Sequence, residues 1–195
     1  GLAAGTAAII FLAMAIVSTI TDGNVNVLGV QLIGFGACLG FLFFNFSPSK
    51  IFMGDAGSML LGFVLATTYL LTIRHPFSAQ LVLGSIFIFA YPAMDVTFAV
   101  YRRFISRLPV FKADQGHIHH VLLSLGFSVR KTVLLIYLVN IIFASLAVLL
   151  LILPVPSYVI LGVGIVTVAG AVYIIKLLLK ISRTNGVGIY NTGEG

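Results

Sequence analysis

The chain has 195 residues, of which 60% are hydrophobic and only 8% are charged, and its mean hydropathy is +1.17. Because soluble domains carry about 25% charged residues, this composition excludes a water-soluble fold and predicts a polytopic all-α bundle in a lipid bilayer. The net charge of +6 would suit nucleic acid in a soluble protein, but basic residues of a membrane protein first report topology. We therefore expect no nucleic-acid partner.

Six apolar segments are long enough to cross a bilayer as helices, since a span needs roughly 20 residues at about 1.5 Å rise each. Lipid leaves the backbone to satisfy its own hydrogen bonds, and the segments lack the alternation of barrel strands. The predicted spans are Leu2–Ile20, Val27–Phe46, Ala56–Ile73, Leu81–Tyr101, Val133–Leu153 and Tyr158–Leu179. They form one predicted bundle over residues 1–183, followed by a polar, glycine-rich, disordered cytosolic tail over 184–195.

Basic residues predict the orientation of this bundle. With Gly1 in the cytosol, every lysine and arginine except Arg74 falls on the cytosolic side. Short loops retain Lys and Arg in the cytosol, so both ends of the chain are expected there. Gly36 and Gly40 form a GxxxG pattern that would allow close helix packing or would arise by chance.

The first polar loop reads NFSPSKIFMGDAGS over residues 45–58. Asp55 follows the loop at the start of a predicted helix, where a carboxylate caps backbone N–H groups. The same carboxylate, at the membrane boundary between Gly54 and Gly57, could bind Mg²⁺ together with substrate phosphate oxygens. Capping and metal binding are equally good interpretations of Asp55 from the residues alone.

The second polar loop, residues 102–131, contains RRFISRLPVFKADQGHIHH and carries an excess of positive charge. Such a cluster suits anionic lipid headgroups or a diphosphate substrate. His117, His119 and His120 indicate proton transfer, phosphate contact or metal ligation. Zinc would need further ligands, and the lone Cys38 lies in an apolar segment, so phosphate contact ranks above zinc.

Asp95 lies inside the fourth apolar span, where an ionisable group is costly. A structural partner within the bundle and a catalytic role are equally good explanations. A transporter or channel with Asp95 as its coupling site is the alternative function, and a non-catalytic scaffold is another. Neither accounts for the histidines together with Phe-Met-Gly-Asp.

The motif N-x-x-P-x-K-I-F-M-G-D-x-G-S at Asn45–Ser58, followed by H-I-H-H at 117–120, resembles the polyprenyl-phosphate N-acetylhexosamine-1-phosphate transferases. The P-x-x-D run at Pro92–Asp95, followed by Arg102 and Arg103, resembles the branch that uses UDP-N-acetylglucosamine. The muramoyl-pentapeptide branch has three adjacent histidines, which this chain lacks.

The resemblance implies transfer of a sugar 1-phosphate from UDP-N-acetylhexosamine to undecaprenyl phosphate, with release of UMP, at the cytosolic face of a bacterial inner membrane. Asp55 would match the family's Mg²⁺-binding aspartate, while Asn45 and Phe52 would match positions of the uridine site. Arg102 and Arg103 would contact phosphate. His117, His119 and His120 would belong to the family's substrate and catalytic loop.

The chain departs from the family in its acidic residues. Family members carry upstream a D-D-x-x-D loop and an N-x-x-D-G-x-D-G segment, and Gly1–Gly5 resembles the end of the latter. We therefore expect a C-terminal portion of a larger transferase that is inactive alone. The sequence leaves the oligomeric state open, a homodimer included.

Overall fold

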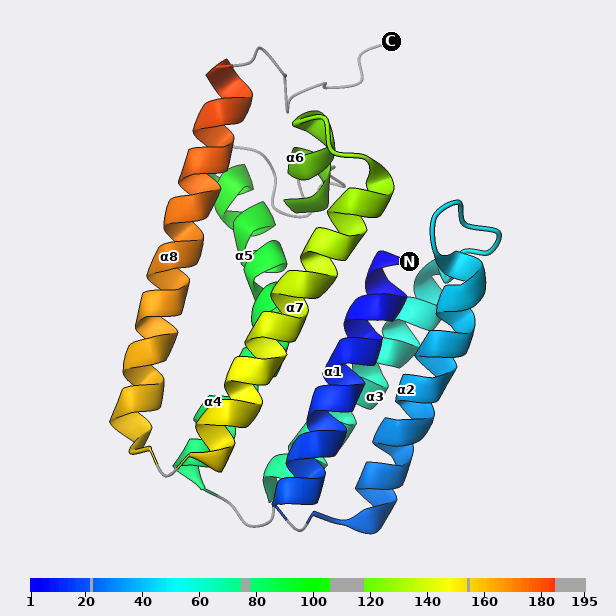
Figure 1. Ribbon diagram of the computed structural model, residues 1–195, viewed down its shortest axis with the longest axis vertical. Coiled ribbons are helices and arrows are strands. Elements are labelled where there is room, and N and C mark those ends of the chain that lie inside the picture. Colours follow the sequence, from blue (N-terminus) through cyan, green and yellow to red (C-terminus); the bar gives the residue numbers. More distant parts are fainter. Residues whose placement is uncertain (22, 75–77, 106–117, 154, 185–195) are drawn as a thin grey trace.

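The computed structural model describes residues 1–21, 23–74, 78–105, 118–153 and 155–184. Its elements, all helical, are shown in Figure 1: α1 (Leu2–Ile20), α2 (Val25–Asn45), α3 (Gly54–Arg74), α4 (Ala79–Ile86), the 3₁₀ turn η1 (Phe87–Phe89), α5 (Ala90–Ile105), α6 (Ile118–Ser124), α7 (Val129–Ile152) and α8 (Ser157–Thr184). Within these ranges, six helical stretches are long and apolar enough to cross a membrane, with α4 to Tyr101 as one of them. The predicted polytopic all-α bundle is confirmed.

The helices begin earlier than the apolar pattern predicts because polar residues cap them. The Asn24 side chain accepts the Asn26 N–H at 2.8 Å, so α2 begins at Val25 rather than Val27. The Ser128 hydroxyl accepts the Lys131 N–H at 3.4 Å, so α7 begins at Val129 rather than Val133. Such caps satisfy N–H groups that a helix start leaves unpaired, and they add a polar turn that hydropathy does not detect. The predicted tail lies outside the described residues apart from Thr184, which ends α8.

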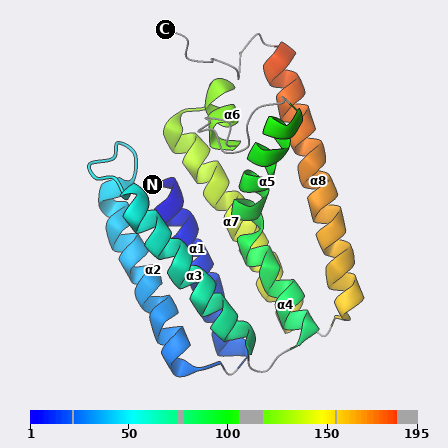
Figure 2. The same cartoon turned by 180° about the vertical axis from the view of Figure 1, so that it is seen from behind.

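The fourth span is interrupted rather than regular. It consists of α4, the 3₁₀ turn Phe87–Phe89 and α5. Pro92 has no backbone N–H and its ring crowds the carbonyl four residues earlier, at Ile88, so the α-helical ladder fails in that turn. The interruption lets α5 take its own direction away from α4 (Figure 2).

The prediction of one loop over residues 102–131 is wrong at both of its ends. Arg102 and Arg103 lie in the last turns of α5, and residues from Ile118 onward form α6. Val121 and Leu122 are buried, and Ile118 packs beside Leu122. The spacing i, i+3, i+4 is an amphipathic helical pattern, which the polar histidines between these residues conceal.

Helix α1 is the central element of the bundle. Most of its residues are buried, and it packs against α2, α3 and α7. At one end, α1, α2 and α3 are joined by a buried polar network in which the Ser18 hydroxyl donates to Gln31 Oε1 at 2.9 Å and Gln31 Nε2 donates to Thr72 Oγ1 at 2.8 Å. Hydrogen bonds between side chains stabilise helix association in lipid, so these three helices form one unit.

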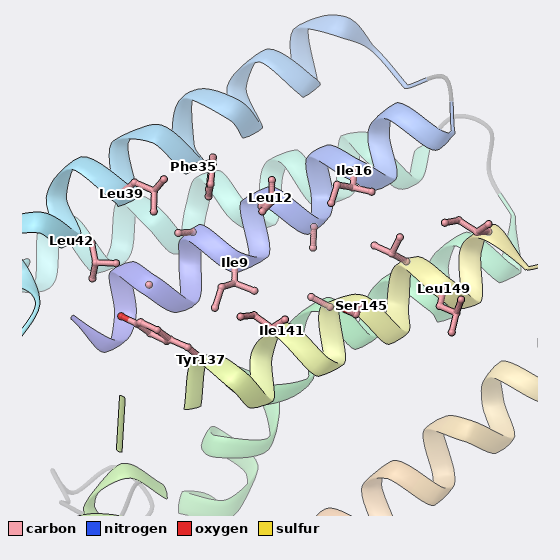
Figure 3. Close-up of a pocket in the computed structure, with 16 residues that line it drawn as sticks. Ile9, Leu12, Ile16, Phe35, Leu39, Leu42, Tyr137, Ile141, Ser145 and Leu149 are labelled. Atoms are coloured by element: carbon pink, nitrogen blue, oxygen red, sulfur yellow. The ribbon is translucent and has the colours of Figure 1, made fainter. Parts of the chain in front are cut away.

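The contact between α1 and α7 joins this unit to the rest of the bundle. A Cβ atom on Gly5 would overlap the ring of Tyr137, whose hydroxyl donates to the Gly1 carbonyl at 2.6 Å. Beside this contact, a cavity of about 500 Å³ lies between α1, α2 and α7, and apolar side chains such as Leu39 and Ile141 line it (Figure 3). Gly36 and Gly40, by contrast, have no described atom within 4 Å of an added Cβ, so the Gly36–Gly40 pattern marks no helix contact among the described residues.

Candidate functional site

Both sequence motifs lie at the same end of the bundle. The turn between α2 and α3, the end of α5, the start of α7 and helix α6 gather there, as Figures 1 and 2 show. The described basic residues follow the same division, because all except Arg74 lie toward this end. The alternation of the helices thus brings segments more than 50 residues apart in sequence, around Asp55 and His119, to one end of the molecule.

The turn between α2 and α3 has a shape fixed by hydrogen bonds. The Lys50 N–H donates to the Phe44 carbonyl at 2.9 Å, and Asn45 Nδ2 donates to the Ile51 carbonyl at 2.7 Å. Asn45 is only 7% exposed, so its amide braces the turn from inside. Gly54 then begins α3 with φ +66°, a left-handed conformation that favours glycine. This explains why Asn45 and Gly54 flank the turn.

Asp55 and Phe52 are the exposed groups of this segment. Phe52 is 83% exposed, which leaves its ring free to stack on a planar ligand. Asp55 lies in the first turn of α3 and is also exposed. Within the described part of the chain, no hydrogen bond to the Asp55 carboxylate is present, so the capping interpretation has no support. The carboxylate is available to a ligand.

The donor set fits Mg²⁺ better than a cation that needs a complete protein cage. In the described ranges, no group of three or more His, Cys, Asp or Glu residues lies close enough together to hold a metal. Mg²⁺ is commonly bound by one or two carboxylates together with water and substrate phosphates. Asp55 can supply one such carboxylate.

Two of the three predicted histidines lie on α6. The rings of His119 and His120 are half-buried, with centroids 4.0 Å apart and an interplanar angle of 37°. His117 lies outside the described residues. The preference for phosphate contact over zinc binding by the histidines therefore stays a prediction. Helix α6 presents the pair next to the ends of α5 and α7.

Asp95 has a protein partner. Its Oδ1 accepts the backbone N–H of Ile118, the first residue of α6, at 2.8 Å. The structural partner that the sequence analysis expected for this carboxylate is therefore present. Arg103 is half-buried near the end of the same helix. The side chain of Arg102 lies outside the described part of the structure. The structure brings Asp95 to the histidine helix, as the sequence did not predict.

Arg130 is a residue that the sequence indicated only as a topological charge. Its Nε donates to the Ser47 carbonyl at 3.0 Å, which links the start of α7 to the turn between α2 and α3. This bond joins the segment that follows the histidines to the segment that precedes Asp55. No sequence signal distinguishes Arg130 from the neighbouring Lys131.

The fold and this site define a multi-pass membrane protein with histidines and an available carboxylate at one end. A family profile described as glycosyl transferase family 4 matches residues 1–73, which include the Asn45–Ser58 motif. No solved structure matches the chain.

Three curated relatives are similar over longer stretches. A Bacillus subtilis protein, "Probable undecaprenyl-phosphate N-acetylglucosaminyl 1-phosphate transferase", is 40% identical over 150 residues, covering 77% of this chain and 42% of the relative. The decaprenyl-phosphate N-acetylglucosaminephosphotransferase of Mycolicibacterium smegmatis is 38% identical, covering 92% of this chain and 49% of the relative. The undecaprenyl-phosphate alpha-N-acetylglucosaminyl 1-phosphate transferase of Escherichia coli K12 is 39% identical, covering 51% and 27%.

The chain thus spans less than half the length of each of these relatives. It belongs to the family of polyprenyl-phosphate N-acetylhexosamine-1-phosphate transferases, as its motifs predicted.

Proposed function

We propose that the protein takes part in the transfer of N-acetylhexosamine 1-phosphate, with N-acetylglucosamine as the sugar, from a UDP-sugar to undecaprenyl phosphate. An oxygen of the lipid phosphate bonds to the phosphorus that carries the sugar, and the bond from that phosphorus to the bridging oxygen of UMP breaks. UMP leaves with that oxygen, and the product is a lipid-linked diphosphate sugar for cell-wall or surface-polysaccharide assembly.

The observation that carries the proposal is the gathering of both motifs at one end of the bundle, joined by the bond between Arg130 and Ser47. A lipid nucleophile stays in the bilayer while a nucleotide sugar arrives from water, so the reaction needs polar groups at a membrane boundary. Asp95, which motivated the transporter alternative, is engaged by the Ile118 N–H. No observation favours transport.

We assign a role in the transfer reaction to each residue of the site. Two phosphates repel as they approach, and bound Mg²⁺ would supply the Lewis acid that neutralises them. Asp55 would hold this ion. Phe52 would stack on uracil, and Asn45 would shape the pocket that receives the uridine. Arg102 and Arg103 would contact phosphate. His117, His119 and His120 would bind substrate and take part in catalysis.

Orientation and location follow from the charge division. The end that carries the motifs would face the cytosol of a bacterium, in its inner membrane, because that end holds the described basic residues other than Arg74. The family resemblance implies further acidic residues upstream, and this chain has only 5 Asp and Glu residues in all, of which Asp55 and Asp95 lie in the described ranges. We therefore propose that these 195 residues are inactive alone.

The proposal is tested by incorporation of radiolabelled UDP-N-acetylglucosamine into lipid extract, with the full-length polypeptide that carries these residues. Asp55→Asn should lower the rate by at least about 10–100-fold, the loss typical even of outer partners of a metal. Asn caps a helix nearly as well as Asp, so membrane insertion should be normal. Ser49→Ala, at an exposed position of the same turn, is the matched control. Near-normal transfer by Asp55→Asn, or no incorporation by the unsubstituted protein, would contradict the proposal.

A further inference from the structure

Helix α6 is too short to be stable without help. It has seven residues, and isolated helices shorter than about 12–15 residues are marginal in water. Its first N–H groups have no acceptor within the helix. One of them, from Ile118, is satisfied by Asp95 Oδ1 at 2.8 Å, a residue 23 positions earlier on another helix. A carboxylate at this position also interacts favourably with the positive end of the α6 dipole.

The same side of α5 supplies a second contact to α6. Tyr91, one turn before Asp95, is 6% exposed and packs with Leu122 of α6 and Ile136 of α7. The apolar side of α6 is thus held by packing, and its start is held by a hydrogen bond. Packing alone would allow the short helix to slide or fray, whereas a directional bond at its first residue fixes the start.

His119 and His120 directly follow the residue that Asp95 holds. The backbone position of both histidines therefore depends on where the Ile118 N–H is held. The bond itself is made by the Asp95 carboxylate and the Ile118 backbone. Any movement of the start of α6 would move both rings relative to the turn that carries Phe52 and Asp55.

We propose that Asp95 is a positioning residue for the transfer reaction: it anchors the start of α6 and so sets where His119 and His120 lie. This inference rests on the proposed function for its catalytic consequence, but not for the anchoring itself. Asp95 acts as a hydrogen-bond acceptor, so an amide oxygen at the same place should keep the anchoring bond, although in a weaker form because the charge is lost.

The test uses the full-length polypeptide in lipid nanodiscs and compares Asp95→Asn, Asp95→Leu and Asp95→Ala. Hydrogen exchange of the α6 amides, read by mass spectrometry, should accelerate by about tenfold or more in the Leu and Ala variants, because they remove a charge-assisted hydrogen bond. Exchange in Asp95→Asn should stay within a few-fold of the unsubstituted protein, since the acceptor is retained. Thr97→Val is the matched control, because the Thr97 hydroxyl donates within α5 to the Ala93 carbonyl.

Activity provides the second readout. Leu and Ala variants should lose kcat for sugar-phosphate transfer by about tenfold or more with little change in the KM for the UDP-sugar, and Asn should restore most of the rate. Unchanged α6 exchange in both the Leu and Ala variants would overturn the proposal, and so would an Asn variant as inactive as the Leu variant. Because exchange does not depend on turnover, absent activity in every protein would reject the proposed function while the exchange data still decide the anchoring.

Discussion

Replacing Gly5 by alanine should destabilise the bundle through a single side chain on another helix. An added Cβ would overlap the Tyr137 ring, so the ring or all of α7 must move. The ring also donates its hydroxyl to the Gly1 carbonyl at 2.6 Å, and a displaced ring loses that bond. The contact joins α1, which packs against the Asp55 helix α3, to α7, which packs against the histidine helix α6.

The expected magnitude follows from three opposing effects. Overpacking costs about 1–3 kcal/mol, and the lost hydrogen bond costs about 1 kcal/mol. Alanine is a better helix former than glycine by about 1 kcal/mol, which offsets part of the cost. The net loss is about 1–3 kcal/mol, equivalent to a fall of about 2–12 °C in the thermal midpoint of a chain of this size.

Thermal unfolding in detergent, followed by loss of helical circular dichroism, measures this change. The same substitution in a Tyr137→Ala background should raise the midpoint instead, because the obstacle is gone and only helix propensity remains. Gly36→Ala is the control, since a Cβ at Gly36 has no described neighbour within 4 Å. A Gly5→Ala protein at least as stable as the unsubstituted chain, with Tyr137 in place, would refute this account of the α1–α7 contact.

Three further predictions concern topology, the histidines and the isolated chain. In a Cys38→Ala background, a cysteine at Asn24 should react with an impermeant maleimide added to intact cells and one at Ser49 should not; the reverse pattern would invert the proposed orientation. In the full-length polypeptide, His119→Ala should depress transfer without releasing metal, whereas stoichiometric zinc lost on this substitution would favour the zinc alternative. The 195 residues expressed alone, in a host deleted for its own such transferase, should form no Mg²⁺-dependent lipid-linked sugar above the empty vector. Robust product would show that acidic residues beyond those of this chain are dispensable.

Much of the fold is determined by local sequence and can therefore be predicted from it. Length and hydropathy predicted all six spans, because a lipid environment imposes nearly the same requirement on each segment regardless of its neighbours. The ends of the helices were less accurate, since caps such as Asn24 and Ser128 depend on one polar side chain rather than on a period. The family could be predicted from two short motifs alone.

The tertiary structure decided which residues meet. Nothing in the sequence pairs Asp95 with Ile118 or Arg130 with Ser47, because these bonds join residues 23 and 83 positions apart whose encounter depends on helix packing. Glycine spacing illustrates the same limit: Gly36 and Gly40 form a GxxxG pattern but have no close neighbour among the described residues, whereas Gly5, which has the same spacing from Gly1, receives the Tyr137 ring. A small residue permits close approach, but only the relative position of two helices determines whether another side chain uses the space.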